Sequence, residues 1–143
     1  MARLRARFGP LELASLYRTE PVSEFPQPDF LNTVAVGRSA EAPEALFEVG
    51  RRLERELGRR ERPRNAPREI DLDLLFVGQE RRDTTSLTLP HPRLRERRFV
   101  LVPLAEVLPD YPLPPDGATA RLLLARLPPG PRVERLGGLA VPP

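Results

Sequence analysis

The chain has 143 residues, 40% of them hydrophobic and 30% charged, which is the composition of a single globular domain. It has no cysteine, no lysine and a single histidine, which excludes thiolate chemistry, paired zinc histidines and lysine-based phosphate or Schiff-base sites. Its 23 arginines against 20 acidic residues leave a net charge of +3, which is too small by itself to indicate nucleic-acid binding.

The sequence also bears on location and domain organisation. No apolar run is long enough to span a membrane, and Met1–Arg5 lacks the apolar core of a signal peptide. We therefore expect a cytoplasmic protein that does not act at membranes. No repeat or long linker divides the chain, so we expect one domain over residues 1–143.

The first half of the chain predicts two strands and a helix. Apolar alternation favours strands over Leu11–Tyr17 and Phe30–Val36, joined as an antiparallel hairpin across the Pro-rich stretch Arg18–Pro28. Pro43–Leu57 fits a helix with proline in its first turn, and Gly58 is expected to end it. The apolar face of this helix comprises Leu46, Val49, Leu53 and Leu57.

The second half predicts two helices and further extended pieces. Leu87–Pro92 is typical of a short extended piece that enters a turn, and Phe99–Val107 is apolar enough for a core helix. Ala118–Leu127 fits an amphipathic helix, and Arg132–Val141 fits a last edge strand. Strands and helices are thus interspersed, which predicts an α+β sandwich.

Two aspartates separated by one apolar residue are the most informative feature of the chain. The alternation in Ile70–Phe76 predicts a half-buried strand, with Asp71 and Asp73 on the face opposite Ile70, Leu72 and Leu74. Their Cα atoms would lie roughly 6.6 Å apart, and two like charges on one strand face need a compensating cation. Mg²⁺ fits, because it typically binds one or two carboxylates together with substrate phosphates.

Arginines crowd the segment before this predicted strand, as a polyphosphate beside a metal ion would require. They are Arg59, Arg60, Arg62, Arg64 and Arg68. The alternative is a solvated strand face whose aspartates pair with arginines.

Four segments together resemble the 6-hydroxymethyl-7,8-dihydropterin pyrophosphokinase family, which transfers a pyrophosphoryl group from ATP to a pterin alcohol in folate biosynthesis. In chain order they are Tyr17–Val22, Pro28–Asn32, Arg64–Leu74, and Leu89–Pro92 with Arg97–Phe99. The resemblance runs from about Leu11 to beyond Pro109. It implies a ferredoxin-like α/β sandwich with an antiparallel sheet.

The resemblance also implies a role for each matching residue. Asp71 and Asp73 would hold two Mg²⁺ ions, and Arg59 and Arg68 would stabilise charge on the phosphates. The positions that match ATP contacts are Glu54, Arg68, His91 and Arg97. The positions that match the pterin pocket are Thr19, Val22, Phe30, Asn32 and Phe99.

The implied mechanism is attack of the pterin hydroxyl on the β-phosphorus of ATP, with AMP as the leaving group. Aromatic rings would stack on either side of the pterin, and Asn32 would read its amide edge. Transfers of this type depend mainly on alignment and charge neutralisation, so they need no obvious general base. The loops Thr19–Pro28 and Arg59–Pro67 are interpreted as lids that exclude water.

Each of these residues has a simpler interpretation as well. Phe30 and Phe99 could be core aromatics, and His91 between two prolines could be a turn residue. Thr19 could merely shape the start of its loop. Glu54 could belong to a solvated helix face with i,i+4 pairing, and that interpretation is favoured for its neighbours Arg51, Arg52 and Arg55.

One departure from the family concerns the beginning of the chain. Family members begin with a strand, a Gly-Ser-Asn loop and a long helix, whereas Arg3–Pro10 resembles the end of that helix. The resemblance therefore implies that a central N-terminal strand is missing. Two explanations stay open: a true start upstream of Met1, or a truncated and inactive relative.

A reading from another class also stays open, in which an arginine-rich α+β module binds RNA through Arg59–Arg68. Against it, the two aspartates would repel a phosphate backbone unless metal were bound. We expect a monomer whose partners are the small molecules ATP and hydroxymethyl dihydropterin, and not nucleic acid.

Overall fold

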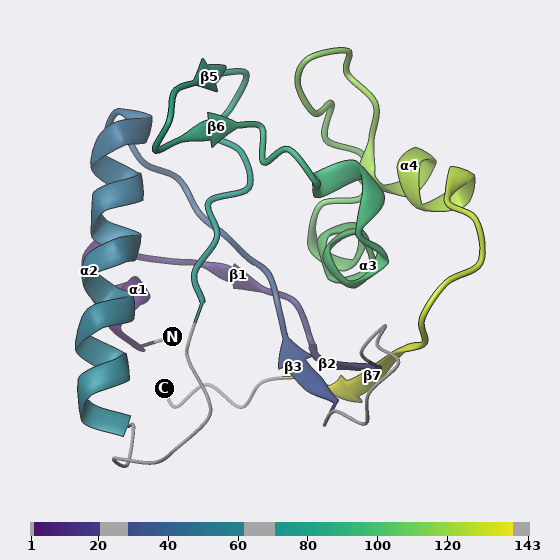
Figure 1. Ribbon diagram of the computed structural model, residues 1–143, viewed down its shortest axis with the longest axis horizontal. Coiled ribbons are helices and arrows are strands. Elements are labelled where there is room, and N and C mark those ends of the chain that lie inside the picture. Colours follow the sequence, from purple (N-terminus) through teal and green to yellow (C-terminus); the bar gives the residue numbers. More distant parts are fainter. Residues whose placement is uncertain (1, 21–28, 62–70, 139–143) are drawn as a thin grey trace.

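The computed structural model describes residues 2–20, 29–61 and 71–138, and the side chains of residues 4–20, 29–58 and 71–138. Short strands and helices are interspersed along the chain (Figure 1). In chain order they are α1 (Ala2–Phe8), β1 (Glu12–Leu13), β2 (Leu16–Thr19), β3 (Phe30–Asn32), β4 (Ala35–Val36), α2 (Pro43–Glu61), β5 (Arg82–Asp83), β6 (Thr88–Leu89), the 3₁₀ turn η1 (Leu94–Glu96), α3 (Arg98–Val107), α4 (Ala120–Arg126) and β7 (Val133–Gly137). Mixed helices and antiparallel strands confirm the predicted α+β class.

The predicted antiparallel pair is present, but each strand is interrupted. β1 pairs with β4 and β2 pairs with β3, both antiparallel, and the register shifts by one residue between the two pairings. Between the two pairings, the Thr33 hydroxyl donates to the carbonyl oxygens of Ala14 (3.1 Å) and Ser15 (2.9 Å). A side chain thus hydrogen-bonds two backbone carbonyls at the position where the ladder is interrupted.

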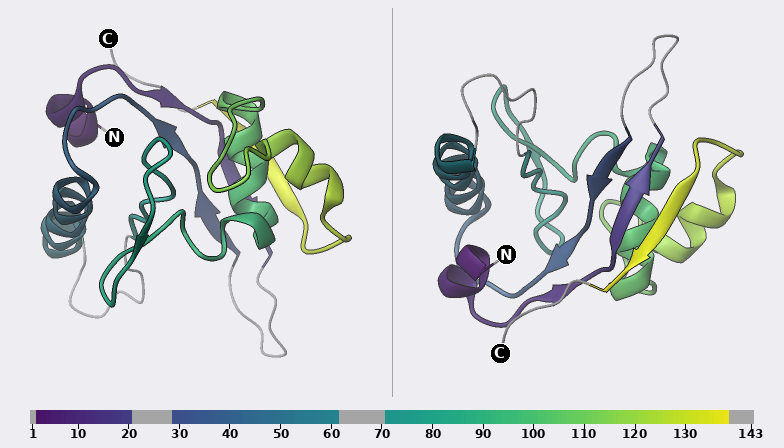
Figure 2. Two further views of the ribbon diagram at one scale, coloured as in Figure 1. Left: turned by 90° about the horizontal axis from the view of Figure 1, so that it is seen from above. Right: turned by 90° about the horizontal axis from the view of Figure 1, so that it is seen from below.

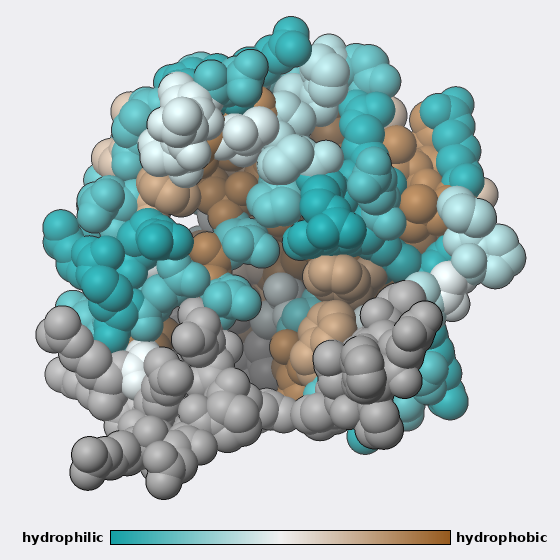
Figure 3. Space-filling model, in the orientation of Figure 1, coloured by the Kyte–Doolittle hydropathy of each residue, from teal (hydrophilic) through white to brown (hydrophobic). Residues whose placement is uncertain are grey.

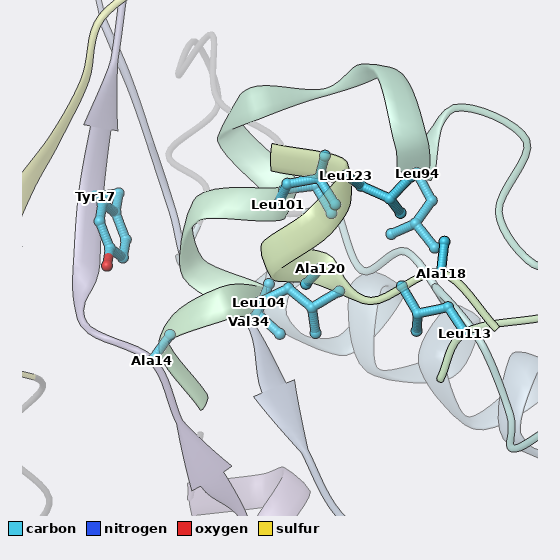
Figure 4. Packing of buried hydrophobic residues seen from close by; sticks show 11 residues of the cluster. Ala14, Tyr17, Val34, Leu94, Leu101, Leu104, Leu113, Ala118, Ala120 and Leu123 are labelled. Atoms are coloured by element: carbon cyan, nitrogen blue, oxygen red, sulfur yellow. The ribbon is translucent and has the colours of Figure 1, made fainter. Parts of the chain in front are cut away.

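β7 completes a three-stranded sheet in the order β3-β2-β7 and confirms the predicted edge strand. Helices α3 and α4 cover one face of this sheet, while α1 and α2 lie at the other side of the molecule (Figures 1 and 2). Hydrophobic burial explains the first arrangement, because Leu104 of α3 lies beside Val34, and Leu101 of α3 lies beside Leu123 of α4, in one core cluster that also contains Tyr17 (Figure 4). The most deeply buried side chains of this core include Leu94, Leu101, Leu104, Leu113 and Ala120.

The three predicted helices form, with differences at their ends. The prediction that Gly58 ends α2 is wrong: α2 continues to Glu61. Glycine ends helices by adopting a positive φ, and Gly58 is not among the glycines that do so. α4 begins later than predicted, because the Thr119 side chain caps it by accepting from the Leu122 amide at 3.2 Å.

The predicted strand over Ile70–Phe76 is not observed. Ile70 lies outside the described residues, and Asp71–Val77 belongs to no strand. It runs between α2 and the stretch of chain that forms β3 and β4 (Figures 1 and 2), and none of the described strands forms a ladder with it. The alternation survives in part, since Asp71 and Asp73 are exposed while Leu72 and Leu74 are half-buried. A β-strand needs a hydrogen-bonded neighbouring strand as well as apolar alternation, and among the described residues this segment has only the alternation.

None of the helices among the described residues is long and apolar enough to cross a membrane.

Candidate active site

A cavity of about 300 Å³ lies where α2, the extended segment Asp71–Leu74 and the stretch Thr85–Pro92 meet. Figure 3 shows that this face of the molecule is hollowed between α2 and α3, with hydrophobic atoms inside the hollow. Arg51, Glu54, Asp71, Asp73 and His91 all line the cavity. The structure therefore brings four predicted site residues, Glu54, Asp71, Asp73 and His91, to one place.

The wall formed by the β5–β6 hairpin is tied to the start of α2. Arg82 on β5 donates to Glu44 on α2, with 2.5 Å between its Nε and Oε2, and to Glu80 at 3.1 Å. The hairpin therefore approaches the helix that carries Arg51 and Glu54. This contact gives one side of the cavity its position.

The aspartate segment is held at two backbone atoms. The Leu72 amide donates to Glu54 Oε2 at 3.0 Å, and the Leu75 carbonyl accepts from the His91 amide at 2.7 Å. Asp71 and Asp73 flank Leu72, and both are exposed. Two accessible carboxylates beside a cavity suit a hard cation that takes oxygen ligands.

These carboxylates do not form a complete protein cage for a metal. Among the described residues there is no group of three or more His, Cys, Asp or Glu side chains arranged to hold an ion. An ion bound at Asp71 and Asp73 must therefore take its remaining ligands from water or from a substrate. Mg²⁺ typically binds in this way, with substrate phosphates completing its coordination.

His91 has a defined protonation state in this environment. Burial lowers the pKa of His91; the Asp73 carboxylate opposes this shift, while Arg97 and Arg93 add to it. Its Nδ1 accepts from the Arg93 amide at 3.2 Å, so the neutral ring carries its proton on Nε2. The neutral ring thus has an N–H donor to offer, which suits a phosphate oxygen.

A second cluster joins the strand pair to the start of α3. Asn32 donates from Nδ2 to the Phe99 carbonyl at 2.6 Å, and its Oδ1 accepts from the Thr19 hydroxyl at 3.3 Å. The rings of Phe30 and Phe99 meet edge to face, with centroids 5.3 Å apart. Thr19, Phe30, Asn32 and Phe99, four of the five predicted pterin residues, are therefore neighbours.

Arg97 connects the two clusters. Its guanidinium carbon lies 5.4 Å from the centre of the Phe99 ring, in a cation–π arrangement. The same residue influences the pKa of His91, which in turn senses Asp73. His91 and Arg97 flank the turn η1, so this short stretch of chain links the aspartate cavity to the aromatic cluster.

Some predicted site residues fall outside the described part of the chain. They are Val22, Arg68 and the side chain of Arg59, together with most of the two loops interpreted as lids. Sequence reasoning left Arg51 on a solvated face, yet it lines the cavity. Its spacing of three residues from Glu54 was the available signal, since such residues share a helix face.

Comparison with known proteins decides the family. The family model described as 7,8-dihydro-6-hydroxymethylpterin-pyrophosphokinase (HPPK) matches residues 1–109. The chain belongs to this family. A relative from Pseudomonas aeruginosa, named 2-amino-4-hydroxy-6-hydroxymethyldihydropteridine pyrophosphokinase, is 39% identical over 126 residues, 88% of this chain and 76% of that protein.

In other relatives, the matched region covers a smaller share of the relative's own length. Proteins of the same name from Bacillus subtilis and Synechocystis are 42% and 37% identical over 67% and 80% of this chain, and in each case the match covers 58% of the relative. A mitochondrial folate synthesis bifunctional protein from Arabidopsis thaliana is 44% identical over 65% of this chain, which is 17% of its own length. The chain thus spans less than two thirds of these three relatives.

Proposed function

We propose that this chain transfers a pyrophosphoryl group from ATP to the hydroxyl of 6-hydroxymethyl-7,8-dihydropterin, releasing AMP. One observation carries the proposal. Arg97 lies over Phe99, and only the short turn η1 separates it from His91 on the cavity wall, so the aspartate cavity and the aromatic cluster lie at the two ends of one short segment. A phosphate chain in the first and a flat heterocycle in the second would meet where Arg97 lies. Membership of the HPPK family and the names of the relatives support this assignment.

In this proposal the cavity takes the nucleotide. Asp71 and Asp73, which both line the cavity, would hold Mg²⁺, and the family resemblance is the basis for inferring two ions. When bound, the ions neutralise phosphate charge. His91 would donate its Nε2–H to a phosphate oxygen, and Arg97, Arg59 and Arg68 would add positive charge.

The aromatic cluster takes the pterin in the same proposal. Phe30 and Phe99 contact each other edge to face, so one ring must swing aside before a flat ring system can lie between them. Phe30 is 37% exposed and therefore has room to move. Asn32 would read the amide edge, with Thr19 holding its carbonyl oxygen.

The proposal also covers the location of the protein, its oligomeric state and the class of ligand that it binds. We infer a cytoplasmic monomer that binds ATP and the pterin rather than nucleic acid. The net charge of only +3 and the exposed aspartates beside the cavity support small-molecule binding over a nucleic-acid backbone. The absence of cysteine suits a reducing compartment.

The Asp73→Asn variant tests this proposal. Loss of one metal-binding carboxylate should raise the barrier by about 3 kcal/mol, which is about a hundredfold in kcat/KM. Folding should be unharmed, since removing one of two adjacent like charges relieves repulsion. Pterin-dependent consumption of Mg·ATP measures the first effect and urea denaturation the second.

Asp83→Asn is the matched control, because Asp83 is an exposed aspartate on β5 that does not line the cavity. It should keep the wild-type rate. Near-normal turnover of Asp73→Asn would contradict the metal assignment, and a loss in both variants would point to a general charge effect.

A further inference from the structure

We propose that Glu54 is a positioning residue: it fastens the aspartate segment to α2 through the Leu72 amide and does not itself bind the nucleotide. This inference rests on the proposed function, since it assigns Glu54 a role in presenting Asp71 and Asp73. It replaces the direct ATP contact expected from the sequence.

The geometry points to this role. Glu54 Oε2 accepts from the Leu72 amide at 3.0 Å, and Leu72 stands directly between the two aspartates. Oε1 lies 3.9 Å from the Arg51 guanidinium. The Glu54 side chain is only 19% exposed, whereas Arg51 is 58% exposed. One carboxylate oxygen is thus hydrogen-bonded to the segment, and the other lies at ion-pair distance from Arg51.

The bond matters because, among the described residues, Leu75 and Phe76 of the segment pack against the core whereas the part between Asp71 and Asp73 is held at the Leu72 amide. Asp71–Val77 forms no ladder with the described strands, so isolated bonds at Leu72 and Leu75 fix its backbone there. A bond from an amide to a carboxylate is stronger than one to a neutral acceptor. Without it, the backbone between the two aspartates would be free to rotate, and their carboxylates would lose their common direction.

Direct roles for Glu54 fit the site less well. A carboxylate repels the phosphates of a nucleotide, and one oxygen of Glu54 is already committed to an amide. Glu54 also does not complete a three-ligand metal group with the described acidic and histidine side chains. Its position on the cavity wall therefore serves the segment that it holds.

Two conservative variants separate the effect of side-chain length from the effect of charge. Glu54→Gln keeps an oxygen at the same distance from the Leu72 amide but loses the charge. Glu54→Asp keeps the charge but withdraws the carboxylate by one methylene. If Glu54 is a positioning residue, Glu54→Gln should stay within about threefold of wild type, and Glu54→Asp should lose about tenfold, the equivalent of one hydrogen bond.

The first readout is amide hydrogen exchange at Leu72 without substrates. Glu54→Asp should exchange about tenfold faster there than wild type, while Glu54→Gln should not. The second readout is turnover: kcat should fall in Glu54→Asp with little change in the KM for ATP. Glu48→Gln and Glu48→Asp are matched controls, because Glu48 is 60% exposed on the same helix and lies beside Arg55.

The outcomes are distinguishable. Unchanged exchange at Leu72 in Glu54→Asp would overturn the inference, and so would a Glu54→Gln variant as defective as Glu54→Asp. Because exchange is measured without substrates, an inactive wild type would refute the proposed function while the anchoring bond would still be tested on its own.

Discussion

At the residue scale, Asn32 makes the clearest link between fold and recognition. Its amide nitrogen donates to the Phe99 carbonyl and its oxygen accepts from Thr19, so the side chain is fixed between β2, β3 and α3. A primary amide has two N–H donors and an oxygen with two lone pairs, and these two bonds use only half of that capacity. In the proposed function, the donor and lone pairs that these described partners do not use would bind a heterocycle beside Phe30 and Phe99.

Asn32→Ala should therefore weaken pterin binding more than nucleotide binding. Loss of about one hydrogen bond predicts a Kd for the pterin about tenfold higher, with the Kd for Mg·ATP unchanged. Fluorescence titration of the pterin measures the first value and calorimetry the second. Thr33→Val is the control, because Thr33 binds only backbone carbonyls of Ala14 and Ser15 among its described partners. Equal loss of pterin affinity in both variants would refute a specific role for Asn32.

Candidate site residues could be predicted from the sequence where they belong to a local motif. Asp71, Asp73 and His91 stood out from the sequence, and the structure places all three on one cavity. The bond from Leu72 to Glu54 could not be predicted, because it joins residues 18 positions apart. Helical spacing gives the face on which Glu54 lies, but not the distance from that face to another segment.

At the element scale, a polar junction joins β2 to α3 beside the hydrophobic core. Glu106 on α3 accepts from the Ser15 amide and hydroxyl at 3.0 and 2.9 Å, and from the Tyr17 hydroxyl at 2.5 Å. Arg135 on β7 donates to the same Ser15 hydroxyl at 2.8 Å. Three elements are therefore fixed around one carboxylate, and α3 carries Phe99 into the aromatic cluster.

Tyr17 provides a pH test of this junction. Burial, together with the bond to Glu106, raises the pKa of Tyr17 from 10.0 to about 12. The unfolded state loses this proton first, so the contribution to stability is present below pH 10 and is lost as the pH rises toward about 12. Ultraviolet absorbance titration of the wild type should show a late tyrosine phase that disappears in Tyr17→Phe.

The same variant should lower the free energy of unfolding by about 1.5–3 kcal/mol at neutral pH, the value of a hydrogen bond to a charged group. Urea denaturation measures it. The junction would be refuted if both tyrosines of the wild type titrated near pH 10.

Apolar periodicity predicted most helices and strands, but its prediction for Ile70–Phe76 was wrong. The strand pair, α2, α3 and α4 follow from apolar spacing because each buries one face in the molecule. The same alternation in Ile70–Phe76 predicted a strand that does not form among the described residues. Spacing reports which side chains share a face, whereas a strand also needs backbone partners, which lie elsewhere in the chain.

At the scale of the whole molecule, the site lies where two parts of the structure meet. In the proposed function, α2 and the β5–β6 hairpin would supply the nucleotide side, and the β2–β3 pair with α3 would supply the pterin side. The extended segment Asp71–Val77 runs between them (Figure 1). The reacting hydroxyl and phosphorus would therefore meet only if both parts keep their relative positions.

The nucleotide product is the most direct test of the central claim. The chain is incubated with Mg·ATP, with and without 6-hydroxymethyl-7,8-dihydropterin, and AMP and ADP are quantified separately. The account predicts AMP formed in equal amount to pterin diphosphate, and only when the pterin is present. ADP as the pterin-dependent product, or no pterin-dependent nucleotide product at all, would contradict it.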